Sequence, residues 1–313
     1  MGKKTVYLLG ILLTILIGTY FYWKHCCGGK LAAQTEKSVV SDTENNNANR
    51  GIEATLRNSF KLSDPNGNFS FRTDNNFNFN SSDFKILLPV SEDLNTGIDD
   101  LQLYLDEHEV KQIDITGLYA LAEDNTSAFP NLGMARATSV KNYFVSRGID
   151  ASRLNLFGKS SDAISASDNI YYGPLNISFS EAGISSEEKE KESMNALKKS
   201  IQDDPLILNF ANAQTQINLS EAQRQKIADI ARYLDKVEDG KALVTGHTDN
   251  TGSREGNILI GQKRADFAKS YLISNGISAA NIESIGKGSD EPIATNDSEE
   301  GRSKNRRTVV TVN

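Results

Sequence analysis

An internal repeat constrains the fold of this chain more than any other feature of its sequence. Residues 136–162 (RATSVKNYFVSRGIDASRLNLFGKSSD) align without gaps with residues 264–290 (RADFAKSYLISNGISAANIESIGKGSD), and 12 of the 27 positions are identical. Upstream the register nearly holds, with Gly117 opposite Gly246. The repeat predicts two tandem copies of one domain, and 313 residues are enough for two domains.

The second copy has the clearer secondary-structure pattern. An apolar run at 206–210 predicts a strand, and 242–246, 282–286 and 308–312 predict three more. Two helices are expected between them, the first of which has an apolar face at helical spacing. That face consists of Ile227, Ile230, Ala231 and Leu234. The order β-α-β-α-β-β predicts an α+β fold with two helices on one face of a sheet.

Capping signals mark the ends of these two helices. Ser220 and Gln223 have the spacing of a capping box at the start of the first helix. The second helix is expected to end at Asn275-Gly276, because glycine can adopt the left-handed conformation that closes a helix. Its apolar face consists of Ala265, Ala268 and Leu272. In the first copy, the same helical spacing is kept by Ile98, Leu101 and Leu105.

The N-terminal segment has the pattern of a membrane anchor. Residues 5–23 carry no charge and would span roughly 28 Å as a helix, close to the thickness of a bilayer's hydrocarbon core. Lys3 and Lys4 precede the segment and Trp23 closes it, so we expect residues 1–4 in the cytoplasm. The pattern predicts a single-pass inner-membrane protein whose remainder lies in the periplasm.

Two alternatives for this segment stay open. It could be a cleaved signal peptide, although it is long and no A-x-A site follows it. Cys26 and Cys27 also raise lipoprotein processing, with outer-membrane association, but Trp23-Lys24-His25 lacks the small residues that such processing favours. The two cysteines could be acylated, paired between chains or free, because adjacent cysteines do not easily bridge each other.

Composition divides the rest of the chain. Residues 24–66 form a polar stretch that we interpret as a flexible tether, and 67–183 hold the first copy of the domain. Residues 184–204 are rich in Glu and Lys and are interpreted as a linker before the second copy at 205–313.

Three motifs fall in the second copy in a fixed order. GHTDNTG occupies 246–252, N-x-x-I-x-x-x-R-A runs from Asn257 to Ala265, and GRSKNRR occupies 301–307. With these motifs, residues 205–313 resemble the OmpA-like C-terminal domain family, the peptidoglycan-binding module also found in Pal and MotB. The first copy would then be a degenerate OmpA-like domain.

The resemblance implies a ligand and the residues that hold it. Family members bind the diaminopimelate of the peptidoglycan stem peptide, whose free end carries an ammonium and a carboxylate. By similarity, Asp249 would accept hydrogen bonds from the ammonium, and the Arg264 guanidinium would fork onto the carboxylate. Further polar groups of the rim would be Thr248, Thr251, Asn257 and Arg306. No cofactor or metal is implied, and two positions depart from the family pattern: Gly261 replaces a common serine, and Ala213 a polar residue.

Other interpretations of these residues were weighed. Asp249 could simply cap its own loop, as Asp often does. A calcium loop is disfavoured, because 249–255 lacks the D-x-[DN]-x-[DN]-G order and the distal glutamate. Catalysis is disfavoured because none of the three histidines has a catalytic or metal-ligand spacing.

Two further classes are also disfavoured. The net charge of −7 argues against a nucleic-acid partner. A stator-type motor subunit needs an ionisable residue in its membrane helix, and residues 5–23 contain no Asp or Glu.

The first copy is expected to keep the fold and to lack the ligand. Ala120 falls opposite Asp249, so the carboxylate that would hold the ammonium is missing. Tyr-Gly-Pro at 172–174 replaces the Asn-Arg-Arg of 305–307. Arg136 survives opposite Arg264, but without an acid in the position of Asp249 it would recognise only half of a zwitterion. The first copy is therefore interpreted as a spacer or as a surface for an envelope protein partner.

Overall fold

The computed structural model describes residues 58–181, 186–209 and 218–313, and these belong to one compact unit. The proposed anchor at 5–23, the two cysteines and most of the tether lie outside the described residues. Within the described part of the chain, no helix combines the length and the apolar character needed to cross a bilayer.

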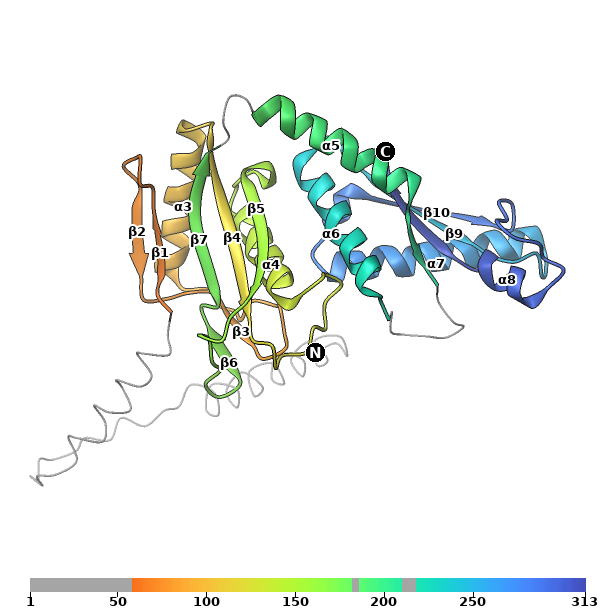
Figure 1. Cartoon of the computed structure of the whole chain (residues 1–313), viewed down its shortest axis with the longest axis horizontal. Helices are drawn as coiled ribbons and strands as arrows, with labels where there is room; N and C mark the ends of the chain where they lie inside the picture. The colour runs from red at the N-terminus through yellow and green to blue at the C-terminus, as the bar shows by residue number, and fades with distance from the viewer. Residues whose placement is uncertain (1–57, 182–185, 210–217) are drawn as a thin grey trace, which may run out of the picture. The chain divides into compact units, whose positions relative to one another are not determined.

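The first half contains a three-stranded sheet with two helices (Figure 1). Its main elements are α3 (Glu92–Glu107), β4 (Lys111–Tyr119), α4 (Leu132–Ser146), β5 (Leu154–Ser160) and β7 (Leu175–Glu181). The strand order is β5-β4-β7, with β4 parallel to β5 and antiparallel to β7. Ile98, Leu101 and Leu105 on α3 are buried, as their spacing predicts.

Short strands that the sequence did not reveal complete this half. Strands β1 (Phe60–Ser63) and β2 (Ser70–Thr73) form a hairpin, and β3 (Asn78–Asn80) pairs with β6 (Ile170–Tyr172). Because alternate residues of β1 are buried in the core, the folded region begins earlier than the predicted boundary at residue 67.

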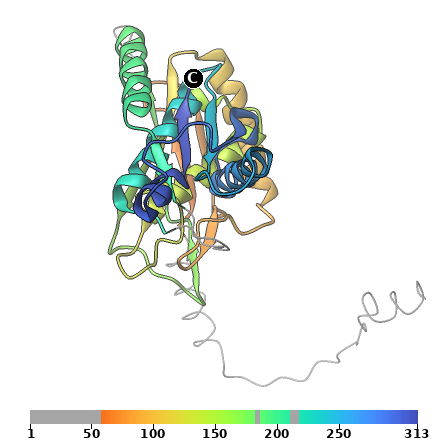
Figure 2. The ribbon, with the colours of Figure 1, turned by 90° about the vertical axis from the view of Figure 1, so that its right-hand side faces the viewer.

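The second half contains a four-stranded sheet of order β10-β9-β11-β8. Its elements are α5 (Ser186–Asp203), β8 (Leu206–Leu208), α6 (Glu221–Lys236), β9 (Ala242–His247), α7 (Arg254–Ser274), β10 (Ile282–Gly288), α8 (Glu299–Asn305) and β11 (Thr308–Val312). Strand β9 is parallel to β10 and antiparallel to β11, which leads to the C-terminus marked in Figure 1 and Figure 2. The chain is therefore α+β, as predicted.

The predicted helix ends are confirmed. The Ser220 hydroxyl accepts the Gln223 N–H at 3.2 Å, and the Gln223 side chain accepts the Ser220 N–H at 2.9 Å. Helix α7 is capped by Asn275, and Gly276 follows with a φ of 95°. The predicted apolar faces of α6 and α7 are buried in one core.

Helix α5 occupies the stretch interpreted as a linker. Ile201 on α5 belongs to the buried core of the second half and Leu197 packs against that core, while Met194 is also buried. Gln202 donates a side-chain hydrogen bond to the Val312 carbonyl at 2.9 Å. The second folded region therefore includes residues before 205. The charged stretch contains apolar residues at helical spacing, and these form the face of α5 that is buried.

The two halves share a packed contact. Ala128 and Phe129, from the loop before α4, belong to the same buried cluster as the core of the second half. The Asn275 side chain accepts the Ala128 N–H at 2.7 Å. Lys141 and Asp235 form an ion pair at 2.7 Å across the same contact.

Two glycines set the distance between α7 and β9. A Cβ on Gly246 would lie 1.8 Å from the Gly261 carbonyl oxygen, and a Cβ on Gly261 would lie 2.5 Å from the Gly246 carbonyl oxygen. Side chains would force this helix and strand apart. The departure of Gly261 from the family's serine therefore has a packing reason in this chain.

Candidate functional site

The motif loop lies at the carboxyl ends of the parallel strands β9 and β10. The Thr248 N–H donates to the Gly288 carbonyl at 2.9 Å, and the His247 N–H donates to the Arg307 carbonyl at 2.8 Å. These bonds fix the loop 248–253 between the end of β10 and the start of β11. Helix α7 begins directly after the loop, with Ser253 as its N-cap.

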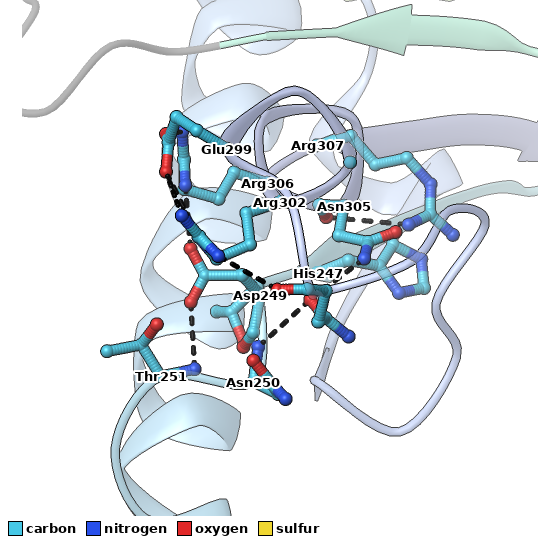
Figure 3. Close-up of polar contacts among 12 residues, drawn as sticks. His247, Asp249, Asn250, Thr251, Glu299, Arg302, Asn305, Arg306 and Arg307 are labelled. Atoms are coloured by element: carbon cyan, nitrogen blue, oxygen red, sulfur yellow. Dashed lines mark hydrogen bonds and ion pairs between the residues drawn. The ribbon is translucent and has the colours of Figure 1, made fainter.

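Asp249 is the centre of the polar contacts in this loop (Figure 3). Its Oδ1 accepts the Thr251 N–H at 2.9 Å, and its Oδ2 pairs with Arg306 Nη1 at 2.8 Å. The Asp249 side chain is 13% exposed. Burial alone would raise the pKa of Asp249, but the hydrogen bonds from Arg306 and Thr251 outweigh burial and lower that pKa below its ordinary value. The carboxylate is therefore ionised at neutral pH.

Helix α8 positions Arg306. Glu299, in the first turn of α8, accepts a hydrogen bond from Arg306 Nη2 at 2.5 Å, and Arg302 donates to the other Glu299 oxygen at 3.0 Å. Figure 3 shows Glu299 above Arg306, on the side away from Thr251. The hydrogen bonds of Arg306 and Arg302 lower the pKa of Glu299. Arg306 is thus shared between two carboxylates.

Sequence reasoning did not find Glu299 or Arg302. The only local signal was their spacing of three residues, which suits an ion pair on one helix face. Asn296 was also missed: its side-chain oxygen accepts the Asn250 N–H at 3.3 Å and links the motif loop to the segment before α8.

Arg264 supplies a second cation from the middle of α7. Its Nη1 donates to the His247 carbonyl at 2.7 Å. Among the residues that the structure describes, no carboxylate lies within ion-pair distance of Arg264. Burial lowers the pKa of Arg264, and the charge of Asp249 opposes that shift. Arginine remains protonated in proteins, so a half-buried guanidinium with free N–H groups stands near Asp249.

The remaining predicted residues lie around this pair. Thr248 is 5% exposed and its hydroxyl donates to the Asp249 carbonyl at 2.8 Å, whereas Thr251 is exposed. Asn257 is 3% exposed on the first turns of α7. The structure therefore brings Thr248, Thr251 and Arg306 into contact with Asp249, while Asn257 and Arg264 come from α7. Ala213 lies outside the described residues.

His247 is a buried neutral group beside the site. It is 3% exposed, and its Nδ1 has no hydrogen-bond partner among the described residues. Burial, followed by the charge of Arg307, lowers the pKa of His247 to about 4. The imidazole is therefore uncharged at neutral pH. No group of three or more metal-ligating side chains occurs in the part of the chain that the structure describes.

This geometry defines a class of protein: an α+β recognition domain with opposite charges held at the carboxyl ends of two parallel strands. The chain belongs to the OmpA family, whose family model matches residues 209–306.

Relatives of known name support this membership. The chain is 33% identical over 143 residues to the peptidoglycan-associated lipoprotein of Buchnera aphidicola, covering 46% of this chain and 79% of that protein. It is 38% identical over 96 residues to the peptidoglycan-binding protein ArfA of Mycobacterium tuberculosis, covering 31% of this chain and 29% of ArfA. These names describe association with, or binding to, peptidoglycan.

Among solved structures, the peptidoglycan-associated lipoprotein of Burkholderia pseudomallei matches at 26% identity and a TM-score of 0.29. The match covers 34% of this chain and 89% of that chain.

Proposed function

We propose that the second half of the described chain, which we call the second domain, binds peptidoglycan non-covalently, through the zwitterionic end of diaminopimelate in the stem peptide. The first half is called the first domain. The observation that carries this proposal is the pairing of an ionised Asp249 with a nearby Arg264 that lacks a carboxylate partner among the described residues. The printed names of two relatives, a peptidoglycan-associated and a peptidoglycan-binding protein, support the same ligand.

The chemistry of the two groups suits such a ligand. Asp249 keeps acceptor capacity beyond its bonds to Arg306 and Thr251, since each carboxylate oxygen has two lone pairs. It can therefore accept hydrogen bonds from an ammonium. Arg264 is held by one bond to the His247 carbonyl, which leaves N–H groups for a forked contact with a carboxylate.

Sacculus co-sedimentation of the full-length protein tests the site. Asp249→Ala and Arg264→Ala should each abolish binding, because losing one partner of a charged hydrogen bond costs about 1.5 to 3 kcal/mol. Free meso-diaminopimelate should compete with the wild type. The full-length chain is preferable to a fragment starting at residue 205, because α5 packs into the core of the second half.

Arg254→Ala is the matched control for this experiment. Arg254 is on the same helix as Arg264, but its guanidinium is exposed and pairs with Asp290 at 2.6 Å. This variant should bind sacculi like the wild type. Wild-type binding by Asp249→Ala or Arg264→Ala would disprove the site.

We also propose that residues 5–23 anchor the protein in the inner membrane and that the second domain attaches it to the cell wall. The uncharged segment behind Lys3 and Lys4 supports this arrangement. Protease added to spheroplasts should digest both domains. Protection of the second domain in intact spheroplasts would refute the proposed topology.

We further propose that the first domain is a degenerate copy of the second. Three pairs of matched contacts support it. Arg136 Nη1 donates to the Leu118 carbonyl at 2.9 Å, as Arg264 does to His247. The Leu118 N–H donates to the Pro174 carbonyl at 2.8 Å, as His247 does to Arg307.

The third matched contact is a close approach of helix and strand. A Cβ on Gly117 would lie 2.0 Å from the Gly133 carbonyl oxygen, which repeats the close approach of Gly246 and Gly261. Common descent from one domain accounts for the same contact at both places.

A further inference from the structure

The buried centre of the first domain is an arginine with its own carboxylate. Arg136 is fully buried, and its Nη2 pairs with Glu123 Oε1 at 2.5 Å while Nη1 donates to Glu123 Oε2 at 3.1 Å. The Glu123 side chain is 2% exposed. Sequence reasoning considered only the position of Asp249, where Ala120 stands, and missed Glu123, which pairs with Arg136 from the loop before α4.

The donors around Glu123 resemble those of a ligand site. Besides the two bonds from Arg136, Oε1 accepts the Ser82 N–H at 3.0 Å and Oε2 accepts the Ala120 N–H at 2.9 Å. Three separate segments of the chain thus direct N–H groups at one carboxylate. Ser82 holds a φ of 57°, a conformation that serine rarely adopts, so this loop is strained where it donates its bond.

Arg136 is otherwise equivalent to Arg264. Both donate through Nη1 to the carbonyl of the residue after the glycine that packs on the helix, Leu118 in one domain and His247 in the other. Ala120, whose N–H binds the Glu123 carboxylate, is aligned with Asp249.

The difference lies in the start of the helix. Helix α4 begins at Leu132, four residues before its arginine, whereas α7 begins at Arg254, ten residues before its own. The residues aligned with the first turns of α7, 126–131, are therefore not helical in the first domain, and Glu123 lies in the loop just before them. The same segment carries Phe129, aligned with the site residue Asn257, into the core of the second half.

We propose that the first domain contains a carboxylate-recognition pocket whose occupant is the side chain of Glu123. The loop 120–131 closes this pocket from within the chain, and the first domain is unable to bind a carboxylate from outside. The inference rests on the proposed function only through the equivalence of Arg136 and Arg264.

Chemical rescue of Glu123→Ala in the full-length protein tests the proposal. The variant leaves Arg136 buried without a partner, so the unfolding midpoint of the first domain should fall on the order of 10 °C. Formate or acetate should raise that midpoint, because either anion can take the place of the carboxylate. Sodium chloride at the same ionic strength should not, and equal effects of chloride and acetate would overturn the proposal.

Asp124→Ala is the matched control. Asp124 is the neighbouring acid, but it is exposed and its carboxylate has no bond to Arg136. Its midpoint should match the wild type in both salts. A loss of stability equal to that of Glu123→Ala would mean that the loop, rather than the occupied pocket, is responsible.

A second measurement keeps the proposal testable if Glu123→Ala does not fold. In the wild type with isotope-labelled arginine, magnetic resonance signals of the Arg264 guanidinium should shift on adding diaminopimelate, and those of Arg136 should not. A shift of Arg136 would refute the closed pocket. An unchanged Arg264 signal would instead contradict the proposed function, but it would not affect the proposal of a closed pocket in the first domain.

Discussion

Arg136 and Arg264 occupy matched positions and have opposite surroundings. Arg136 is fully buried, paired with Glu123, and lies over the rings of Phe79 and Tyr171 at 5.4 and 5.1 Å. Arg264 is half-buried and keeps the backbone bond that both arginines share. Within the described residues, the Arg136 guanidinium has a carboxylate partner and the Arg264 guanidinium has none.

The difference shows how one arrangement of helix, strand and arginine can stabilise a fold or bind a ligand. A buried charge must be paired, so an arginine at this position needs a carboxylate, either from the chain itself or from a ligand. In the first domain Glu123, in the loop before α4, supplies it. In the second domain the helix stays wound from Arg254, and we propose that the ligand supplies it.

The largest expected effect separates the two arginines. Arg264→Lys should lower sacculus binding at least about tenfold, because lysine cannot fork onto a carboxylate, and should leave stability nearly unchanged. Arg136→Lys should do the reverse, lowering the free energy of unfolding by about 3 to 5 kcal/mol while binding persists. Co-sedimentation and denaturant unfolding measure the two effects. If both variants show the same phenotype, the comparison fails.

The glycine pairs give the next largest effect. Gly133→Ala and Gly261→Ala place a Cβ 2.3 and 2.5 Å from the facing carbonyl oxygens, so each should cost about 1 to 3 kcal/mol of stability. Only Gly261→Ala should also weaken sacculus binding, since it displaces the helix that carries Arg264. Binding lost equally in both variants would indicate a global effect and would break the distinction between the domains.

Acid should weaken the second domain selectively. The unfolded chain binds a proton at His247 near pH 6.5, and the folded chain near pH 4. Between these values the unfolded state holds more protons, so the free energy of unfolding falls as the pH drops from about 6.5 to about 4. The aligned residue in the first domain is the apolar Leu118.

Hydrogen exchange of β4 and β9 amides at pH 7 and pH 5 would report each domain. Exchange of the β9 amides, corrected for the intrinsic rate, should show lower protection at pH 5, and His247→Leu should remove much of that change. An unchanged pH response in the variant would assign the effect to another group.

The smallest effect concerns the shared cation Arg306. In Glu299→Gln, Arg306 loses one of its two carboxylates and can fork onto Asp249, which leaves Asp249 less available to an ammonium. Sacculus affinity should fall by about fivefold at most, as for an exposed ion pair. Glu300→Gln is the control, because Glu300 pairs with Lys304 instead. Equal effects of the two substitutions would show only a change in net charge.

Much of the secondary structure of the second domain was predictable, because the spacing of apolar residues along the sequence reflects which face of each helix or strand is buried. The strand predicted at 308–312 is β11. The predicted capping box has Ser220 as the N-cap of α6, which starts at Glu221. Helix α8 was not predicted, because its seven residues contain no apolar periodicity. Asp249 and Arg306 were predicted to line the same site but not to contact each other. Their direct ion pair depends on α8, which positions Arg306.

The closed pocket of the first domain could not have been predicted from local patterns. Glu123 lies in a polar stretch whose sequence predicts an ordinary surface loop. Its partners Ser82 and Arg136 are distant from it in sequence. The repeat alignment fixes the position of Arg136 but carries no information about how far the helix before it is wound. Only the three-dimensional position of the loop identifies the acid.

Helix α5 has a mechanical consequence for the chain. Strand β8 lies at the sheet edge and is paired with β11 over only three residue pairs, so it would peel easily under a pull applied directly to its end. A force from the N-terminal side reaches α5 first. Leu197 and Ile201 pack α5 onto the core of the second half, so a load on α5 would be spread over these side chains before any strand bond is strained. With the proposed anchor at residues 5–23, a pull from the membrane side would therefore load α5 before β8.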